Sequence, residues 1–294
     1  MKLAVHFMAY NSSRFLEAVV SNMEPFVDRI YIIYPHRPFN YNKKARTCRQ
    51  NPTSIEEVNR FQALEKVKII LDDSEDEFTP RNKCLRLARE EGFDWLITQD
   101  ADEFYPEESW ARIRQKLLSA KSIDHFATTW YNFWKSSHYV LVDPNVGIKQ
   151  VNTNFAIRCK SDLRFVGIRR PNAESTTIID APCFHYAYAM SDAEILEKVT
   201  TWAHTSEVSI RKWYDLKWLR WNERTRYLHP INPLAWNRAI RFPHQQPQFA
   251  EQFNFDLKIR RSTDYSTALH AWYYDRKASG RDFLRRAYHL LLEK

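Results

Sequence analysis

Four short apolar segments, separated by amphipathic stretches, constrain the fold of this chain more than any other feature. The segments are Leu3–Met8, Arg29–Tyr34, Val67–Leu71 and Trp95–Thr98. Each has the length of a buried strand. The stretches between them carry apolar residues three or four positions apart, as in Phe15, Val19 and Met23, which indicates helices. Strands that alternate with helices predict an α/β fold with a mostly parallel sheet and helices on both faces. Ligands of such sheets bind at the carboxyl ends of the strands.

The composition is that of a folded protein without a membrane-spanning segment. Hydrophobic residues make up 44% of the 294 residues and only 4 are glycine, which excludes a disordered or collagen-like chain. The mean hydropathy is −0.59. No apolar run reaches about 18 residues, and the first residues lack the pattern of a signal peptide. We therefore expect a cytoplasmic protein. Its four cysteines are widely spaced, which predicts free thiols.

The positive charge is concentrated in the last third of the chain. Residues 201–294 hold 17 Lys and Arg against 9 Asp and Glu, so this segment alone carries the net charge of +8. The same segment contains six of the ten tryptophans. A basic, aromatic-rich region is typical of a surface that docks a polyanion. The other interpretation is a solvated helical face with buried tryptophans, and the sequence leaves both open.

Two regions of different character follow from this pattern. Residues 1–190 contain the alternating strands and helices and are predicted to form an α/β core. Residues 191–294 are predicted to form a basic, Trp-rich and mainly helical region for docking or packing. The sequence contains neither a GxGxxG fingerprint nor a Walker motif, which argues against a dinucleotide-binding Rossmann site and against a P-loop. It does not indicate an oligomeric state.

The sharpest local motif follows the fourth predicted strand. Asp100, Asp102 and Glu103 place three carboxylates within four residues, and such a group repels itself unless a cation lies among them. In an extended backbone, residues two apart point the same way, so the side chains of Asp100 and Asp102 converge. Oxygen ligands at this spacing suit Mg²⁺ or Mn²⁺. A solvated acidic turn is the alternative.

Several motifs in their order along the chain resemble a known family. Tyr10 and Asn11 follow the first strand, Pro80-Arg81-Asn82 opens a helix, and a strand leads into the DADE run. This order resembles the GT-A glycosyltransferases, especially the family 2-like group. Residues 184–188 (FHYAY) and 228–233 (LHPINP) resemble segments of its bacterial and phage members. The resemblance implies a metal-dependent transferase that takes its sugar from a nucleotide-diphosphate sugar, with a UDP-sugar as the expected donor. It makes residues 1–190 the nucleotide-sugar-binding and catalytic core, and residues 191–294 a region for acceptor docking or packing.

The resemblance also implies roles for individual residues. Asp102 matches the carboxylate that coordinates the Mn²⁺ or Mg²⁺ ion, and Asp100 matches the one that contacts the ribose or a metal-bound water. His185 matches a further metal ligand, although a buried core histidine is the alternative. The predicted nucleotide-binding residues are Ala9, Tyr10 and Asn11 at the nucleobase, Asp72 or Asp73 near the base or ribose, and Arg81 with Asn82 beside the nucleotide.

The catalytic base is assigned by position alone. An inverting transferase needs a carboxylate near the acceptor hydroxyl. Glu174, which shortly precedes His185, is the predicted base and joins Asp102 as a catalytic residue. Asp162 and Asp180 are its competitors. The family's usual base motif is not clearly present, so the inverting or retaining outcome stays open.

The functional hypotheses differ in the acceptor that they assign to the protein. A hydroxymethylated base in phage DNA fits the basic region 201–294, because a duplex requires phosphate neutralisation, and implies the host cytoplasm as the location. A cell-surface glycan or a lipid is the alternative acceptor. A hypothesis of another class is a non-catalytic nucleic-acid-binding module that keeps a relic GT-A core. The aromatic run 130–134 is either an acceptor platform or a buried core strand.

Overall fold

The computed structural model describes residues 1–38, 50–160, 162–201, 209–253, 269–277 and 280, and the chain divides into two compact units. Unit 1 consists of Met1–Tyr131 and Lys149–His185, and unit 2 consists of Asn132–Ile148 and Tyr186–Lys294. The segment 132–148 thus belongs with the C-terminal part of the chain. The predicted division into a catalytic region 1–190 and a docking region 191–294 concerns activity as well as packing, and it stays a prediction.

The four predicted strands form the parallel part of the sheet in unit 1. They are β1 (Leu3–Met8), β2 (Arg29–Tyr34), β3 (Val67–Leu71) and β4 (Trp95–Thr98). Their order is β4-β1-β2-β3. Every neighbouring pair is parallel, and this parallel pairing was predicted. In the register of β1 and β4, His6 lies beside Thr98. The carboxyl ends of these two strands therefore meet at one edge of the sheet.

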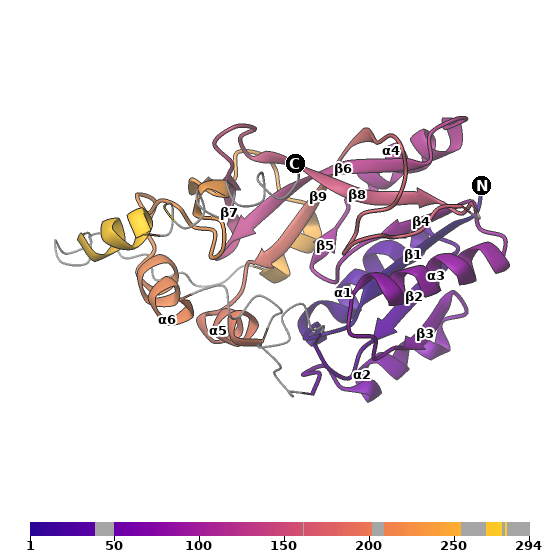
Figure 1. Ribbon diagram of the computed structural model, residues 1–294, viewed down its shortest axis with the longest axis horizontal. Helices are drawn as coiled ribbons and strands as arrows, with labels where there is room; N and C mark the ends of the chain where they lie inside the picture. The colour runs from indigo at the N-terminus through magenta and orange to yellow at the C-terminus, as the bar shows by residue number, and fades with distance from the viewer. Residues whose placement is uncertain (39–49, 161, 202–208, 254–268, 278–279, 281–294) are drawn as a thin grey trace. The chain divides into compact units, whose positions relative to one another are not determined.

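Antiparallel strands extend this sheet beyond β4. β8 (Lys149–Arg158) pairs with β4, and β6 (His125–Trp134) pairs with β8. A two-residue strand, β5 (Glu103–Phe104), pairs with β9 (Thr177–Tyr188) so that Glu103 faces His185 and Phe104 faces Phe184. The sheet is therefore mixed, with its parallel strands gathered at one side (Figure 1).

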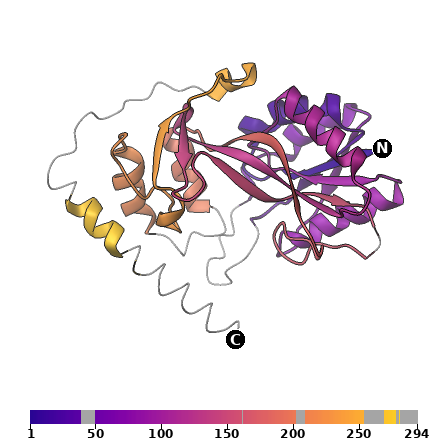
Figure 2. The same cartoon turned by 90° about the horizontal axis from the view of Figure 1, so that it is seen from above.

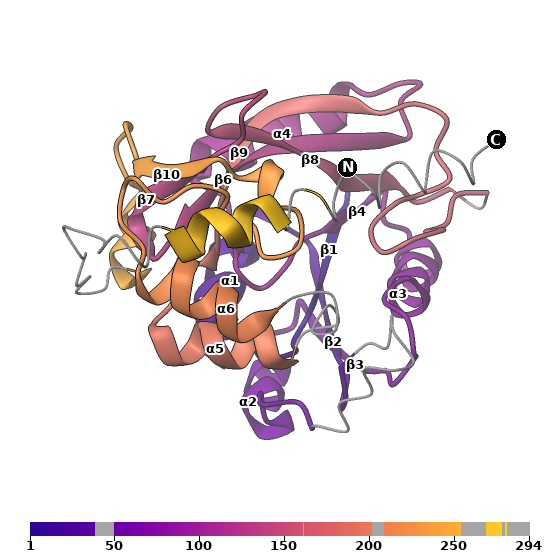
Figure 3. The ribbon, with the colours of Figure 1, turned by 60° about the vertical axis from the view of Figure 1, so that its left-hand side comes forward.

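The helices of unit 1 begin and end where local chemistry favours it. They are α1 (Ser13–Met23), α2 (Ile55–Asn59), α3 (Phe78–Glu90) and α4 (Glu107–Ser119), with short 3-10 turns at Glu24–Phe26 and Arg60–Ala63. Ser54 and Glu57 form a capping box at the start of α2. Just after α3, Gly92 adopts a φ of +74°, which suits the end of a helix. Helices α1 and α3 lie on opposite sides of the parallel strands (Figure 3), and helices flank the strands in the turned view as well (Figure 2).

One core cluster lies between α3 and the parallel strands. Cys84, Leu85 and Ala88 of α3 are buried against strand residues that include Ala4 and Leu96. Along β1 the residues on this face alternate with those on the other, so His6 shares the α3 face with Ala4. The residues of α3 one turn before Cys84 therefore approach the carboxyl ends of β1 and β4.

Unit 2 combines helices with a short antiparallel sheet. β7 (Ser136–Val142) pairs with β10 (Arg238–Arg241) and with the end of β6. The helical elements are α5 (Asp192–Thr201), α6 (Ile210–Trp213), a π-helix at Tyr214–Leu219, and 3-10 turns at Pro233–Ala235 and Gln248–Phe253. Helices α5 and α6 lie side by side (Figure 1 and Figure 3). The predicted helical character is confirmed, while β10 was not expected, because four residues between prolines carry no strand periodicity of their own.

Tryptophans form the core of unit 2. Trp213, Trp218 and Trp221 are at most 2% exposed. The ring of Trp218 packs edge-on against Trp134, with centroids 4.8 Å apart. Most of the described tryptophans of the C-terminal region are thus packing residues rather than a stacking surface, while Trp202 lies outside the described residues.

Two predictions from composition concern the chain as a whole. Among the residues that the structure describes, no helix is long and apolar enough to cross a membrane. Cys84, Cys159 and Cys183 have free thiols, as predicted, and Cys48 lies outside the described residues.

Candidate functional site

The site begins with a polar pair inside the apolar sheet. His6 and Thr98 are neighbours in the β1–β4 register, and His6 Nε2 lies 3.0 Å from Thr98 Oγ1. Both residues are at most 1% exposed. Burial, and then the positive charges of Arg81 and Arg169, lower the pKa of His6 well below its usual range. His6 is therefore a neutral imidazole at the inner wall of the site.

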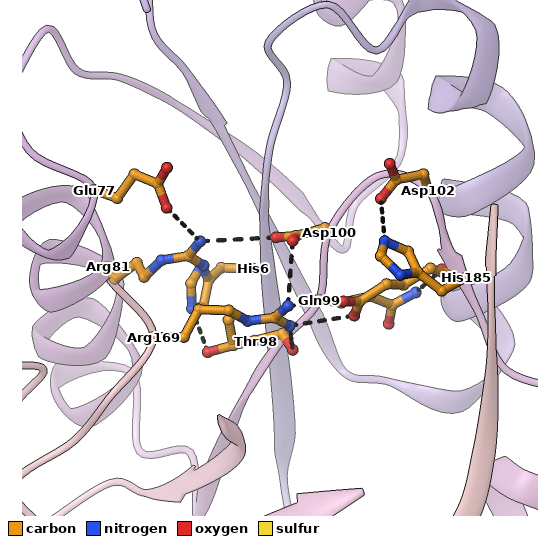
Figure 4. A network of polar contacts seen from close by, with 10 residues as sticks. His6, Glu77, Arg81, Thr98, Gln99, Asp100, Asp102, Arg169 and His185 are labelled. Carbon is orange, nitrogen blue, oxygen red and sulfur yellow. Dashed lines mark hydrogen bonds and ion pairs between the residues drawn. The ribbon is translucent and has the colours of Figure 1, made fainter. Parts of the chain in front are cut away.

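Arg81 extends from the first turns of α3 over this pair. It is only 2% exposed. Its Nη2 lies 3.4 Å from Glu77 Oε2 and 3.7 Å from Asp100 Oδ1 (Figure 4). The other two guanidinium nitrogens, Nε and Nη1, are buried without a hydrogen-bond partner within the described chain. A buried guanidinium held by two long contacts has unused donors, and such groups in native proteins call for a ligand or ordered water.

A second arginine, Arg169, binds the acidic run much more tightly. Its Nη1 donates to Glu103 Oε1 at 2.7 Å and its Nη2 to Glu103 Oε2 at 3.2 Å. Nη1 also donates to Asp100 Oδ2 at 3.2 Å. Burial alone would lower the pKa of Arg169, but Asp100 and Glu103 raise it above its usual range. Burial raises the pKa of Glu103 and the Arg169 charge opposes that shift. The paired geometry is that of an ionised, two-pronged ion pair.

Asp102 lies on the other side of the same turn, beside His185. Asp102 Oδ1 is 3.3 Å from His185 Nε2. The Asp102 side chain is 15% exposed and that of His185 is 14% exposed, so both are partly accessible to solvent. Figure 4 shows Asp102 and His185 on one side and Asp100 with the two arginines on the other. The two aspartates of the motif thus have different partners and do not converge on one point.

Trp130 fixes the plane of the His185 ring. The two rings are stacked, with centroids 4.8 Å apart and an interplanar angle of 8°. Trp130 itself is half-buried. The aromatic run 130–134 is divided in role, because Trp134 is fully buried in unit 2 while Trp130 supports a candidate site residue in unit 1.

Asn82 supports the fold next to the site. Its Nδ2 donates to Phe165 O at 2.9 Å, and its Oδ1 accepts from Phe165 N at 2.8 Å. Both ends of the amide are therefore engaged by the backbone of another segment. A nucleotide contact for Asn82 stays a prediction, and this arrangement gives it a structural role as well.

The loop after β1 is fixed by backbone contacts. Ala9 is fully buried, its N–H donates to Ile33 O, and its carbonyl accepts from Asn51 Nδ2 at 2.6 Å. Asn11 adopts a φ of +48° and its N–H donates to Asn51 Oδ1. Tyr10 between them is half-buried. Asn51, which the sequence did not single out, therefore holds the predicted nucleobase loop in shape.

Asp72 and Asp73 follow β3 and have separate partners. Asp72 accepts from Lys83 Nζ at 3.2 Å and from the backbone and hydroxyl of Ser74. Asp73 accepts from the His36 backbone at 2.8 Å and lies 2.9 Å from His36 Nδ1. Partial burial opposes the shift, but these His36 contacts lower the pKa of Asp73. Asp72 is the more buried of the two side chains, at 9% exposed against 56%.

The predicted base and its competitors lie on the surface. Glu174 is exposed at a bend before β9. Asp162 is exposed, and Asp180 is exposed and paired with Lys149. The exposed position of Glu174 does not test its role as the catalytic base, and that role stays a prediction.

The structure adds residues that sequence reasoning missed. His6 had a readable signal, a polar residue inside an apolar strand, and Glu103 was visible as the third carboxylate of the DADE run. Arg169 had none, because it lies 66 positions after Glu103 in an irregular segment. Conversely, Lys217 belongs to the basic segment 201–294, which was interpreted as a possible docking surface for a polyanion. It is 1% exposed, donates to Arg226 O and pairs with Asp275, so it is buried and unavailable to phosphate.

Comparisons with known proteins give fold-level similarities only. No protein-family model matches the chain, and no curated protein matches it. Among solved structures, TarS 1–349 of S. aureus aligns with 75% of this chain and 71% of its own, at 9% identity and a TM-score of 0.40. The mannosyltransferase PcManGT from Pyrobaculum calidifontis, solved with GDP-Man and Mn²⁺, aligns with 68% of this chain and 62% of its own, at 11% identity and a TM-score of 0.38.

A third solved structure gives a similar alignment. HddC from Yersinia pseudotuberculosis, solved with GMP-PN, aligns with 65% of this chain and 96% of its own, at 9% identity and a TM-score of 0.39. At these sequence identities and TM-scores, the alignments show only a partial similarity of backbone path. They assign this chain neither a family nor an activity.

Proposed function

We propose that this protein is a glycosyltransferase that uses a nucleotide-diphosphate sugar, bound at the carboxyl ends of β1 and β4. The observation that carries the proposal is the arrangement around the DADE turn. Asp102 and His185 form a partly exposed pair, while Asp100 lies between the buried Arg81 and Arg169, whose side chain is 12% exposed. Parallel sheets bind ligands at this edge, and the arrangement offers both a cation-binding pair and cationic groups for a polyphosphate.

The residues present fit a divalent cation that shares its ligands with a diphosphate. The described residues include no group of three or more His, Cys, Asp and Glu that would enclose a metal alone. Mg²⁺ and similar hard cations are commonly held by one or two protein groups, with substrate phosphates and waters completing the shell. Asp102 and His185 would supply those protein ligands, and an imidazole favours Mn²⁺. When bound, the cation neutralises charge on the departing diphosphate.

Asp100 would then be a nucleotide contact rather than a metal ligand. Its carboxylate lies 3.2 Å from Arg169 Nη1 and 3.7 Å from Arg81 Nη2, and its side chain is 41% exposed. Its contacts with the two arginines orient the carboxylate. Its exposed edge can accept hydrogen bonds from a ribose, and the loop Ala9–Asn11 lies after the neighbouring strand.

A single carboxylate variant tests the donor site. We expect Asp102→Asn to lower Mn²⁺-dependent nucleotide release by roughly 100-fold or more, because the cation loses an anionic ligand. Asp94→Asn is the matched control, since Asp94 adjoins the opposite end of β4 and its side chain is 52% exposed. Release of nucleotide from a panel of nucleotide sugars is the measurement. Equal loss in both variants would contradict the assignment.

The catalytic base is tested separately. If Glu174 deprotonates the acceptor, Glu174→Gln lowers turnover by roughly 100- to 10,000-fold while binding of the donor with Mn²⁺ is unchanged. Glu90→Gln, the same change at a carboxylate of α3 that is 54% exposed, is the control. Wild-type turnover in Glu174→Gln removes that residue from the mechanism.

Two classes of acceptor, DNA and a glycan or lipid, are compatible with the charge pattern, and an experiment distinguishes them. The net charge of residues 201–294 favours a phosphate-rich acceptor such as hydroxymethylated duplex DNA, with a glycan or lipid as the alternative. Nucleotide release that depends on the modified duplex, and weakens as salt rises, supports DNA. Release indifferent to DNA moves the acceptor to a glycan or lipid. No donor binding with Mn²⁺ would leave the relic binding module as the better interpretation.

A further inference from the structure

One side chain, Arg169, joins three points of the turn that carries Asp102. Its Nη2 donates to Thr98 O at 3.0 Å, where the turn leaves β4. Its Nη1 bonds Asp100 Oδ2, and both terminal nitrogens bond the carboxylate of Glu103. The guanidinium therefore links the start, the first corner and the end of the turn (Figure 4).

The turn is closed by its own hydrogen bonds as well. Glu103 N donates to Asp100 O at 3.1 Å, and Gln99 Nε2 donates to Glu103 O at 2.6 Å. Asp102 lies between these two bonded positions. Because Glu103 faces His185 in the pairing of β5 with β9, fixing Glu103 fixes the backbone on both sides of the Asp102–His185 contact.

The chemistry of this contact requires an arginine. Glu103 is 0% exposed, so its charge depends on a partner inside the protein. A planar guanidinium can meet both oxygens of one carboxylate and still reach a carbonyl and a second carboxylate. A lysine would carry the same charge as a single point and lose this geometry.

The segment that carries Arg169 is held firmly against α3. Asn82 engages both the N–H and the C=O of Phe165, and the Phe165 side chain is buried in the core cluster beneath α3. Val166 N donates to Arg170 O at 2.9 Å, closing the loop around Arg169. Arg169 therefore acts from a fixed support rather than from a free surface loop.

We infer that Arg169 is a positioning residue: through Glu103 and the turn it holds Asp102 and His185 at the separation at which they act together. The inference rests on the proposed function only in taking that pair as the donor-cation ligands. The hydrogen bonds of Arg169 to Thr98, Asp100 and Glu103 run to the turn on both sides of Asp102, so the turn carries its effect to the pair.

The test compares Arg169→Lys with Arg158→Lys. Arg158 also links a carboxylate to backbone carbonyls, since it pairs with Asp124 and donates to Ala120 O and Ile123 O. It lies on β8 opposite Trp95, at the far end of β4. The two variants thus make the same chemical change at the two ends of one strand.

Two readouts are taken on the full chain. Amide hydrogen exchange of the peptide covering residues 98–105 reports the turn independently of any activity. The second readout is Mn²⁺-dependent binding of the nucleotide sugar that the donor panel identifies. It reports whether Asp102 and His185 can still act together as cation ligands. We expect Arg169→Lys to speed exchange in this peptide and to weaken the metal-dependent binding by roughly 10- to 100-fold, with both unchanged in Arg158→Lys.

Either unchanged readout in Arg169→Lys overturns the inference, provided that circular dichroism shows a folded protein. If that variant does not fold, Glu103→Gln replaces it, because it removes the partner's charge while keeping its shape, and its outcomes are interpreted in the same way. If the wild-type protein binds no nucleotide sugar with Mn²⁺, the proposed function fails, and the exchange measurement alone decides whether Arg169 holds the turn.

Discussion

The two units bury charged side chains in different ways. In unit 1, Arg81 and Arg169 gather with Asp100 and Glu103 in one network that reaches solvent through Asp100, and Arg81 retains buried donors without partners. In unit 2, the buried lysines Lys217 and Lys135 do not share a network, and each has its own protein partners. Lys217 is an example, with one carboxylate and one carbonyl as partners.

Lys135 shows the same closed arrangement in unit 2. It pairs with Asp192 at 3.0 Å and lies 4.0 Å above the Trp218 ring, whose Nε1 also donates to Asp192. A buried charge whose partners are all protein groups stabilises or specifies a fold. A buried cation with unused donors, next to partly exposed carboxylates, marks a place for a ligand. This difference separates the candidate site from the packing of unit 2.

The largest expected effect is loss of the Arg169 charge. Arg169→Met leaves the carboxylate of Glu103 fully buried without a counter-ion, so we expect the free energy of unfolding to fall by about 3–5 kcal/mol. Urea unfolding followed by circular dichroism measures it. The double variant Arg169→Met with Glu103→Leu should recover part of the loss, and a double variant less stable than Arg169→Met would contradict this account.

The next effect is a pH dependence that belongs to unit 1. Burial lowers the pKa of His125 to about 4, against an unfolded value of 6.5. The unfolded chain therefore binds protons that the folded chain does not as pH falls from 6.5 towards 4, so this stability is present above pH 6.5 and is lost in acid. Its full size is about 3 kcal/mol.

Unfolding at pH 7 and pH 4.5 checks this assignment. His125→Gln keeps a polar partner for Thr176, whose Oγ1 lies 2.8 Å from His125 Nδ1, and should reduce the difference between the two pH values. The pKa of the buried His6 is also lowered, so part of the pH dependence of stability remains in this variant. A pH difference identical to wild type in His125→Gln would show that His125 does not contribute.

The smallest effect is expected in unit 2. Lys217→Met removes the cation from the Arg226 carbonyl and from Asp275, whose pKa burial already raises so that it can take up a proton instead. We expect a loss of about 1–3 kcal/mol and no change in donor binding. Loss of metal-dependent donor binding in this folded variant would break the distinction between the two units.

The sequence predicted the skeleton of unit 1 well, and the reason is local. The bounds of all four parallel strands were readable, because a short apolar run between polar ends has few alternatives once helices are seen on either side. The order of the strands, which places β4 beside β1, was not predicted and comes from the structure. Asp102 and His185, each predicted as a metal ligand, lie 3.3 Å apart, and their role as ligands stays a prediction.

The C-terminal region was harder to interpret for a physical reason. A tryptophan-rich, basic segment has the same composition whether its rings pack inside or stack on a ligand. Only the burial of Trp213 and Trp218 in a common core, and the burial of Lys217, decided between those interpretations at these three positions.

By itself, the sequence determined the strands, the parallel sheet and the placement of the DADE run at the edge where ligands bind, because these depend on periodicity and chain direction. The tertiary structure decided which partner each carboxylate has. Asp100 pairs with two arginines, Asp102 with His185, and Glu103 with Arg169 from a distant irregular segment. Side-chain partners that are far apart in sequence leave no local pattern, so only the folded chain shows them.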